Sequence, residues 1–276
     1  MRFLKMLRHD IKQGIINQSA RFLIIVIVVI TAYSSWDIYL GYLREHDISL
    51  TNVNMTDCFM YIFSGMQVYR FDPKAFISPP LTWIVFNIMI LYVTAYYPGR
   101  DMENYGKTIF MAGKTRTSWW LSKMLWCALA VVICYLLTFF LIWCIASSGG
   151  YKWNFDNGSE FLISQYGNSV RYLDKSDVYL LVFILPIVIS IALCEFQMLI
   201  GFILTPVISF AAMSALFVFS IYNSYWWLLP NYTMWRRSVY YDVKGFSPLS
   251  GLILSGYLLM FVLVYGVMII RRRDIM

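Results

Sequence analysis

The triplet Gly113-Lys114-Thr115 matches the end of a phosphate-binding P-loop. A Walker A motif carries another glycine five positions before its second one, follows a buried strand and opens a helix. Position 108 is a threonine, and the triplet follows an apolar segment and a polar loop. No acidic residue that ends an apolar strand comes after it, as a Walker B aspartate would. We therefore do not expect this chain to hydrolyse ATP by itself.

Histidines, cysteines and acidic residues offer few other sites for chemistry. His9 and His46 are far apart, which gives no support to a histidine-rich metal site. No two cysteines form a CxxC pair, and four of the five lie in apolar runs, where they are expected to behave as small hydrophobic residues. An intramembrane enzyme needs paired His, Asp or Glu residues inside the membrane. Glu195 is the one acidic residue deep in an apolar block, so this class is an alternative rather than the preferred interpretation.

The composition is that of an all-α integral membrane protein. Of the 276 residues, 60% are hydrophobic and 13% charged, whereas soluble domains have about a quarter charged. The mean hydropathy is +0.63. The net charge of +7 then concerns topology and anionic lipid, and we see no clustered basic face that would bind nucleic acid. We expect the basic and then apolar N-terminus to be a retained first span, because no small-residue cleavage site follows it.

Long gaps between charged residues predict six spans in a single transmembrane domain over residues 1–276. A helix that crosses the hydrocarbon core needs about 20 mostly apolar residues. The block 178–235 contains one charge and is long enough for two helices, with a turn near Gly201 and Pro206. The predicted spans are 22–42, 81–98, 121–146, 178–200, 206–227 and 249–270.

The distribution of Lys and Arg predicts the orientation of these spans. The N-terminal segment, the 99–120 loop and the tail after residue 270 are richer in Lys and Arg, per residue, than the other three connections. Lys and Arg favour the cytoplasmic side. We therefore expect a multi-pass plasma-membrane protein with both termini in the cytoplasm and outer loops at 44–80, 148–177 and 228–248.

Two segments at the cytoplasmic side have amphipathic patterns. Residues 1–20 predict an interfacial helix on anionic lipid, with an apolar face and a basic face. The apolar face holds Leu4, Leu7, Ile11 and Ile15, and the basic one Arg2, Lys5, Arg8 and Lys12. In the 99–120 loop, Met102, Tyr105, Ile109 and Ala112 recur at helical spacing. This second helix either lies on the inner leaflet or docks into a groove on a partner protein.

Three stretches carry a resemblance to a known family: Gly99 to Lys107, then Gly113-Lys114-Thr115-Arg116, then Trp119 to Lys123. Together they resemble the cytoplasmic loop of ABC-2-type transporter permeases. In that family an acidic, glycine-containing segment follows the second span, and a basic residue and a lysine lead into the third. The likeness covers the whole chain through the six spans, the N-terminal helix, the tight hairpin between spans four and five, and the end 271-RRRDIM-276.

The resemblance implies that the 99–120 loop is a coupling helix that fits a cleft of a separate ATP-binding subunit. It implies two ATPase subunits and a second permease chain, identical or homologous, in each transporter. This chain then binds no cofactor of its own, and ATP and Mg are bound in the partner. The expected contacts to the ATPase are Glu103, Tyr105, Gly106, Lys107 and Arg116. The N-terminal helix is either a passive lipid anchor or an elbow helix that also touches the ATPase.

Other polar and aromatic residues have two open interpretations each. The segment 225-YWWLLPNYTMWRRSVYY-241 is an aromatic belt at the headgroups or, as the resemblance implies, a re-entrant outer gate. The gate residues would be Trp226, Trp227, Trp235, Arg236 and Arg237. Glu195 lies about 25 Å along span four, near the cytoplasmic end, which favours a boundary role over proton coupling. Pro186 and Pro206 either kink a moving helix or, for Pro206, open span five.

From the sequence we expect the membrane subunit of an ABC exporter for an amphipathic substrate such as a peptide, an antibiotic or a lipid-like molecule. Export is favoured because we see no docking signal for a substrate-binding protein. The alternatives are an intramembrane enzyme and a membrane sensor or scaffold without transport. The substrate and the identity of the second permease stay open.

Overall fold

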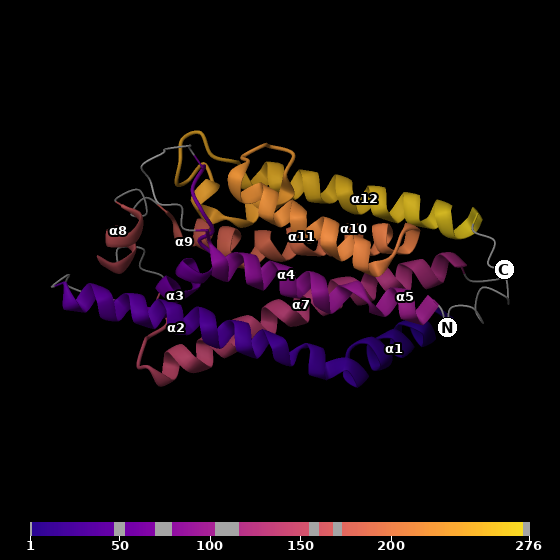
Figure 1. Ribbon diagram of the computed structural model, residues 1–276, viewed down its shortest axis with the longest axis horizontal. Helices are drawn as coiled ribbons and strands as arrows, with labels where there is room; N and C mark the ends of the chain where they lie inside the picture. Colours follow the sequence, from indigo (N-terminus) through magenta and orange to yellow (C-terminus); the bar gives the residue numbers. More distant parts are fainter. Residues whose placement is uncertain are drawn as a thin grey trace.

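The computed structural model describes residues 2–46, 53–69, 79–102, 116–154, 160–167 and 173–272. The regular secondary structure in this part of the chain is helical, apart from one isolated bridge, Ser238 to Phe246. The long helices run side by side (Figure 1). They are α1 (Arg2–Gly14), α2 (Leu23–Glu45), α4 (Leu81–Ala95), α7 (Arg116–Ser148), α10 (Leu185–Ile203), α11 (Pro206–Tyr222) and α12 (Pro248–Arg272). The short elements are η1 (Ile16–Arg21), α3 (Met55–Ile62), α5 (Tyr97–Asp101), α8 (Glu160–Tyr166), α9 (Lys175–Val178), η4 (Tyr179–Ile184), η5 (Leu229–Thr233) and η6 (Trp235–Arg237).

The bundle has two distinct ends (Figure 1). Helices α1 and α5 lie at one end together with the last turn of α12, and we call this the α1 end. Helices α3, α8 and α9 lie at the other, the α3 end. The start of α1 and the end of α12 thus share one end, as an even number of spans requires. That this end faces the cytoplasm stays a prediction.

Five helices are long and apolar enough to cross a membrane, which is compatible with a multi-pass membrane protein. They cover Leu23–Glu45, Leu81–Asp101, Arg116–Ser148, Lys175–Ile203 and Pro248–Arg272. Each contains, or nearly contains, one of the predicted spans. The span predicted at 206–227 corresponds to α11, which has only 17 residues and ends at Tyr222. The sixth span therefore stays a prediction.

Local chemistry fixes both ends of α11. Thr205 accepts a hydrogen bond from the backbone N–H of Ile208 at 3.2 Å, and Pro206 occupies the first helical turn, where its missing N–H costs nothing. This confirms that Pro206 opens the helix. At the other end the backbone of Asn223 is extended, and its side chain donates to the carbonyl of Phe219 at 3.1 Å. The uncharged run continues beyond Leu229, but the helix does not.

Helix α10 is the centre of the bundle. It packs against α4, α7, α11 and α12, and it is buried on most of its circumference because its sequence is apolar all round. It continues from α9 through η4, a π-helical stretch that ends just before Pro186. Proline cannot donate to the residue four positions earlier, so the irregular turn lies where the regular hydrogen-bond pattern must be interrupted.

The α3 end is closed by aromatic side chains. Helix α3 begins with a capping box in which Asn54 and Asp57 each accept from the other's backbone N–H. It then packs between α2 and α7. Edge-to-face and tilted ring pairs join it to α4, α7 and η4 through Phe59, Phe63, Phe86, Tyr135, Phe139 and Phe183.

Candidate functional site

Helix α1 docks on the bundle through a face that is neither its apolar stripe nor its basic stripe. The buried positions are Met6, Asp10 and Gly14, one turn apart, and they face α7. A Cβ atom at Gly14 would lie 2.3 Å from the indole nitrogen of Trp126, so glycine allows this close approach. Of the predicted apolar stripe, Leu4 is exposed, whereas Leu7, Ile11 and Ile15 are half-buried. The basic Lys5, Arg8 and Lys12 point away from the bundle and are exposed or nearly so.

A buried lysine holds α1 and α5 against α7. The side chain of Lys123 on α7 is fully buried, and its ammonium contacts the carboxylates of Asp10 on α1 and Asp101 on α5. The distance from Lys123 Nζ to Asp101 Oδ2 is 2.7 Å. The ammonium also lies 4.6 Å from the ring centre of Tyr97 and 5.3 Å from that of Trp119. We call Asp10, Asp101 and Lys123 the ion triad.

Both carboxylates of the triad have further donors. Asp10 accepts from the Tyr97 hydroxyl at 2.8 Å and from the Ser122 hydroxyl. Asp101 accepts from the indole N–H of Trp119 at 3.1 Å, and His9 Nε2 lies 3.6 Å from its other oxygen. Buried charges are tolerated only when paired and hydrogen-bonded in this way. Two carboxylates face one ammonium, and the imidazole of His9 lies beside one of them.

The ion triad joins the two ends of the predicted coupling loop. Asp101 precedes residues 103–115 and Lys123 follows them, so both stems of the loop are fixed to each other and to α1. Four predicted contact residues, Glu103, Tyr105, Gly106 and Lys107, lie outside the described residues. Arg116, the fifth, opens α7 and donates to the carbonyl of Arg271 near the end of α12 at 3.2 Å.

A second buried cation, Arg237, lies towards the α3 end of the bundle. Its guanidinium is fully buried and donates to the carbonyls of Ser220 and Ile221, in the last turn of α11, at 2.6 Å each. It also donates to the carbonyls of Met66 and Gln67 and to the side-chain oxygen of Asn231. Cations are favoured at a helix C-terminus. Burial lowers the pKa of Arg237 to about 10, so the group stays charged at neutral pH.

The five predicted gate residues do not form one cluster. Trp226 and Trp227 are 66% and 52% exposed, whereas Trp235 and Arg237 are buried. The indole of Trp235 donates to the carbonyl of Met60 on α3 at 2.8 Å. Arg236 lies over the ring of Tyr166, 5.1 Å from its centre. Two of the residues therefore face outward and three are part of the packing, and a gating role for them stays a prediction.

Glu195 lies in the middle of the bundle on α10. Its side chain is 3% exposed, and one carboxylate oxygen has no hydrogen-bond partner among the described residues. The expected boundary position would let it reach water or a partner, and this conformation encloses it instead. Gln197, two positions farther along α10, donates to the carbonyl of Leu91 on α4 at 3.0 Å.

A family model described as Protein of unknown function (DUF2705) matches residues 27–276. The chain belongs to this family. No curated protein and no solved structure matches it. In this DUF2705 chain the matched region begins within α2, so it covers the positions of Asp101, Lys123 and Arg237 but not α1.

The pairing of Asp10 with Lys123 was not predicted from the sequence, although each residue stands out from its surroundings there. Asp10 is the single acid in the basic N-terminal segment, and Lys123 is a charge inside the predicted third span. A lone acid in a basic amphipathic segment and a lone lysine in an apolar helix could each have been recognised as a candidate for a buried ion pair. The spacing along the chain could not show that the two helices meet.

Proposed function

We propose that this chain is the membrane-spanning permease subunit of an ABC transporter that exports an amphipathic substrate. It works with two separate ATPase subunits, which bind ATP and Mg, and with a second permease that is identical or homologous. The resemblance to ABC-2-type permeases in and around residues 99–123 supports this proposal, and so does the all-helical bundle with long apolar helices.

Among the structural observations, the ion triad gives the strongest support to this proposal. A subunit driven by a partner must transmit force from a contact loop to its spans without the loop stems separating. Asp101 and Lys123 fix the two stems of the 99–120 loop together, and Asp10 adds α1 to the same unit. A push on the loop would therefore move the second and third spans and α1 together. The hydrogen bond from Arg116 to the end of α12 extends this unit to the last helix.

The proposal is tested by affinity purification of the chain from its native membranes in mild detergent, followed by identification of co-purifying proteins. We expect an ATP-binding subunit in near-equal amount to the permease. Glu103→Arg and Arg116→Glu should each weaken that association and the coupled ATPase activity. Lys152→Glu is the control, because it reverses an exposed charge near the α3 end.

Three outcomes distinguish the alternatives. A second, different permease in the complex would indicate a heterodimer. Absence of any ATPase in several detergents would overturn the proposal and favour an enzyme, or a sensor or scaffold. An ATPase that binds and couples equally well to both loop variants and the control would show that the contact lies elsewhere on the chain.

A further inference from the structure

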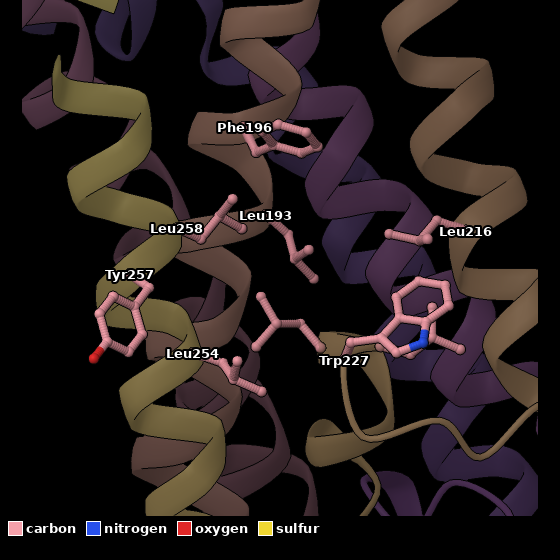
Figure 2. Close-up of a pocket in the computed structure, with 9 residues that line it drawn as sticks. Leu193, Phe196, Leu216, Trp227, Leu254, Tyr257 and Leu258 are labelled. Atoms are coloured by element: carbon pink, nitrogen blue, oxygen red, sulfur yellow. The ribbon is translucent and has the colours of Figure 1, made fainter. Parts of the chain in front are cut away.

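A pocket of about 400 Å³ lies between α10, α11 and α12 (Figure 2). Leu193 and Phe196 of α10 form its back wall, and Leu216 of α11 forms one side. The other side is formed by α12, through Leu254, Tyr257 and Leu258. Residues 227–229 line one end.

The pocket exists because α11 and α12 both pack against α10 and are held apart by the segment between them. That segment is folded around Asn231, whose side-chain amide donates to the carbonyls of Asn223 and Tyr225 at 3.1 Å each. Tyr232 donates to the carbonyl of Trp226 at 2.7 Å. Element η5 contacts α10, α11 and α12, and so fixes the spacing of the helices at this end.

The side chains of the lining are hydrocarbon apart from the indole N–H of Trp227 and the hydroxyl of Tyr257. None of its residues is charged, and the hydroxyl of Tyr257 points away from the cavity (Figure 2). A ligand rich in amides or hydroxyls would leave those groups without partners there, at a high cost in free energy. A hydrocarbon chain has no polar groups, so it would leave no hydrogen bond unmade there. Because α10 and α12 belong to candidate spans, the medium around the pocket is expected to be lipid.

The aromatic residues at the Trp227 end of the pocket indicate the direction in which such a chain lies. Trp226 and Trp227 are more than half exposed, and the rings of Tyr225 and Trp227 stack at 5.8 Å. Tyr and Trp gather at the level of lipid headgroups. Away from this end, the ring of Phe196 approaches that of Phe261 at 6.4 Å. A polar headgroup is therefore accommodated at the Trp226–Trp227 end.

We propose that this pocket binds one acyl chain of a membrane phospholipid, with the headgroup beside Trp226 and Trp227. A phospholipid is the source of hydrocarbon chains that surrounds α11 and α12 at high concentration. The volume falls within the range of about 300–1,000 Å³ that is usual for ligand pockets. This inference goes beyond the proposed function and does not need an ATPase.

The test uses the full chain in nanodiscs of phosphatidylcholine that contain a phosphatidylcholine probe with a photoactivatable diazirine in one acyl chain. After irradiation, labelled peptides are identified by mass spectrometry. We expect labelling of Leu193, Phe196 and Leu258 above the level on the exposed α12 face at Met268. The variant Leu216→Trp/Leu254→Trp fills the pocket and should lower that labelling about tenfold, because several methylene contacts are lost.

The control is Ile208→Trp/Leu249→Trp, which adds the same side chains to exposed positions of the same two helices. Its labelling should equal that of the unmodified chain. Equal labelling in the filled and control variants would overturn the proposal and assign the label to lipid around the bundle. If the filled variant does not fold, Leu254→Phe is the milder replacement. Native mass spectrometry should then show one retained phospholipid in the unmodified chain and less in that variant, and equal retention would also overturn the proposal.

Discussion

Lys123 and Arg237 are two fully buried cations towards opposite ends of the same helical bundle, and their partners differ in kind. Lys123 contacts two carboxylates, from α1 and α5. Arg237 has no carboxylate among its hydrogen-bond acceptors in the described part of the chain. Its acceptors are four backbone carbonyls and the amide oxygen of Asn231.

The difference follows from the shapes of the two side chains. An ammonium is a compact point charge, so it neutralises carboxylates that approach from different sides. A guanidinium is a rigid fork with five donors, so it can join several neutral acceptors on separate segments. Substitutions at Lys123 are therefore expected to lower stability by upsetting the balance of charge. Substitutions at Arg237 are expected to lower stability by changing the geometry of the donors. Each expectation can be tested by substitution.

The largest effect is expected for Lys123→Met, which leaves two buried carboxylates without their cation. Removal of one partner from a buried ion pair costs about 3–5 kcal/mol of folding free energy. We expect a large drop in the temperature at which the detergent-purified chain loses its monodisperse elution after heating. Lys5→Met, at an exposed position of α1, is the control and should change little.

The triple variant Asp10→Asn/Asp101→Asn/Lys123→Met removes all three charges. It should recover most of the lost stability, because a buried triad replaced by neutral groups is often tolerated. A triple variant as unstable as Lys123→Met would mean that hydrogen bonds and packing, and not charge balance, explain the effect. The contrast with Arg237 would then disappear.

Arg237→Lys keeps the positive charge but removes the planar guanidinium with its five donors. We expect a cost of about 1–3 kcal/mol, because the ammonium cannot reach the end of α11 and the 66–67 backbone together and leaves buried acceptors unpaired. Arg236→Lys is the matched control, since its guanidinium lies over aromatic rings. Thermal stability of both variants in one detergent is the measurement. If Arg237→Lys were as stable as the unmodified chain, charge alone would explain the role of Arg237.

The helices were predictable because apolar runs without charges leave few other structures in a membrane. Five of the six predicted spans correspond to long apolar helices. The early end of α11 was not predictable in this way. Residues 223–229 carry no charge, so charge spacing did not separate them from the span. The helix ends at Tyr222 because Arg237 and Asn231, farther along the chain, bind its carbonyls and the segment after it.

The site was less predictable than the fold for a similar reason. Hydrophobic periodicity identified the apolar stripe of α1, but the docking face is set by Asp10 and Gly14. A glycine and one acid contribute little to a hydrophobic pattern. Their role depends on Trp126 and Lys123, more than 100 residues away in sequence, and a single sequence does not show such contacts.

The docking of α1 should also be sensitive to a single methyl group. In Gly14→Ala the new Cβ would overlap the indole of Trp126, and overpacking of this kind costs about 1–3 kcal/mol. We expect faster cleavage at Lys5 and Lys12 by trypsin in membrane vesicles, since α1 would detach. Gly41→Ala is the control, because no atom lies near its Cβ position and alanine favours a helix. Equal cleavage in both variants would show that the ion triad holds α1 without close packing.

The smallest effect is expected for His9→Ala, which tests whether the triad needs a second cation. His9 is 29% exposed at its side chain and lies 3.6 Å from Asp101, so water can replace it at little cost. Partly exposed ion pairs contribute about 0.2–1 kcal/mol. The thermal stability of His9→Ala should therefore lie close to that of the unmodified chain and far above that of Lys123→Met. If His9→Ala were nearly as unstable as Lys123→Met, one ammonium would not be enough for two buried carboxylates. The α1 end would then be held by two cations on two helices, and its contrast with the single guanidinium of Arg237 would be larger.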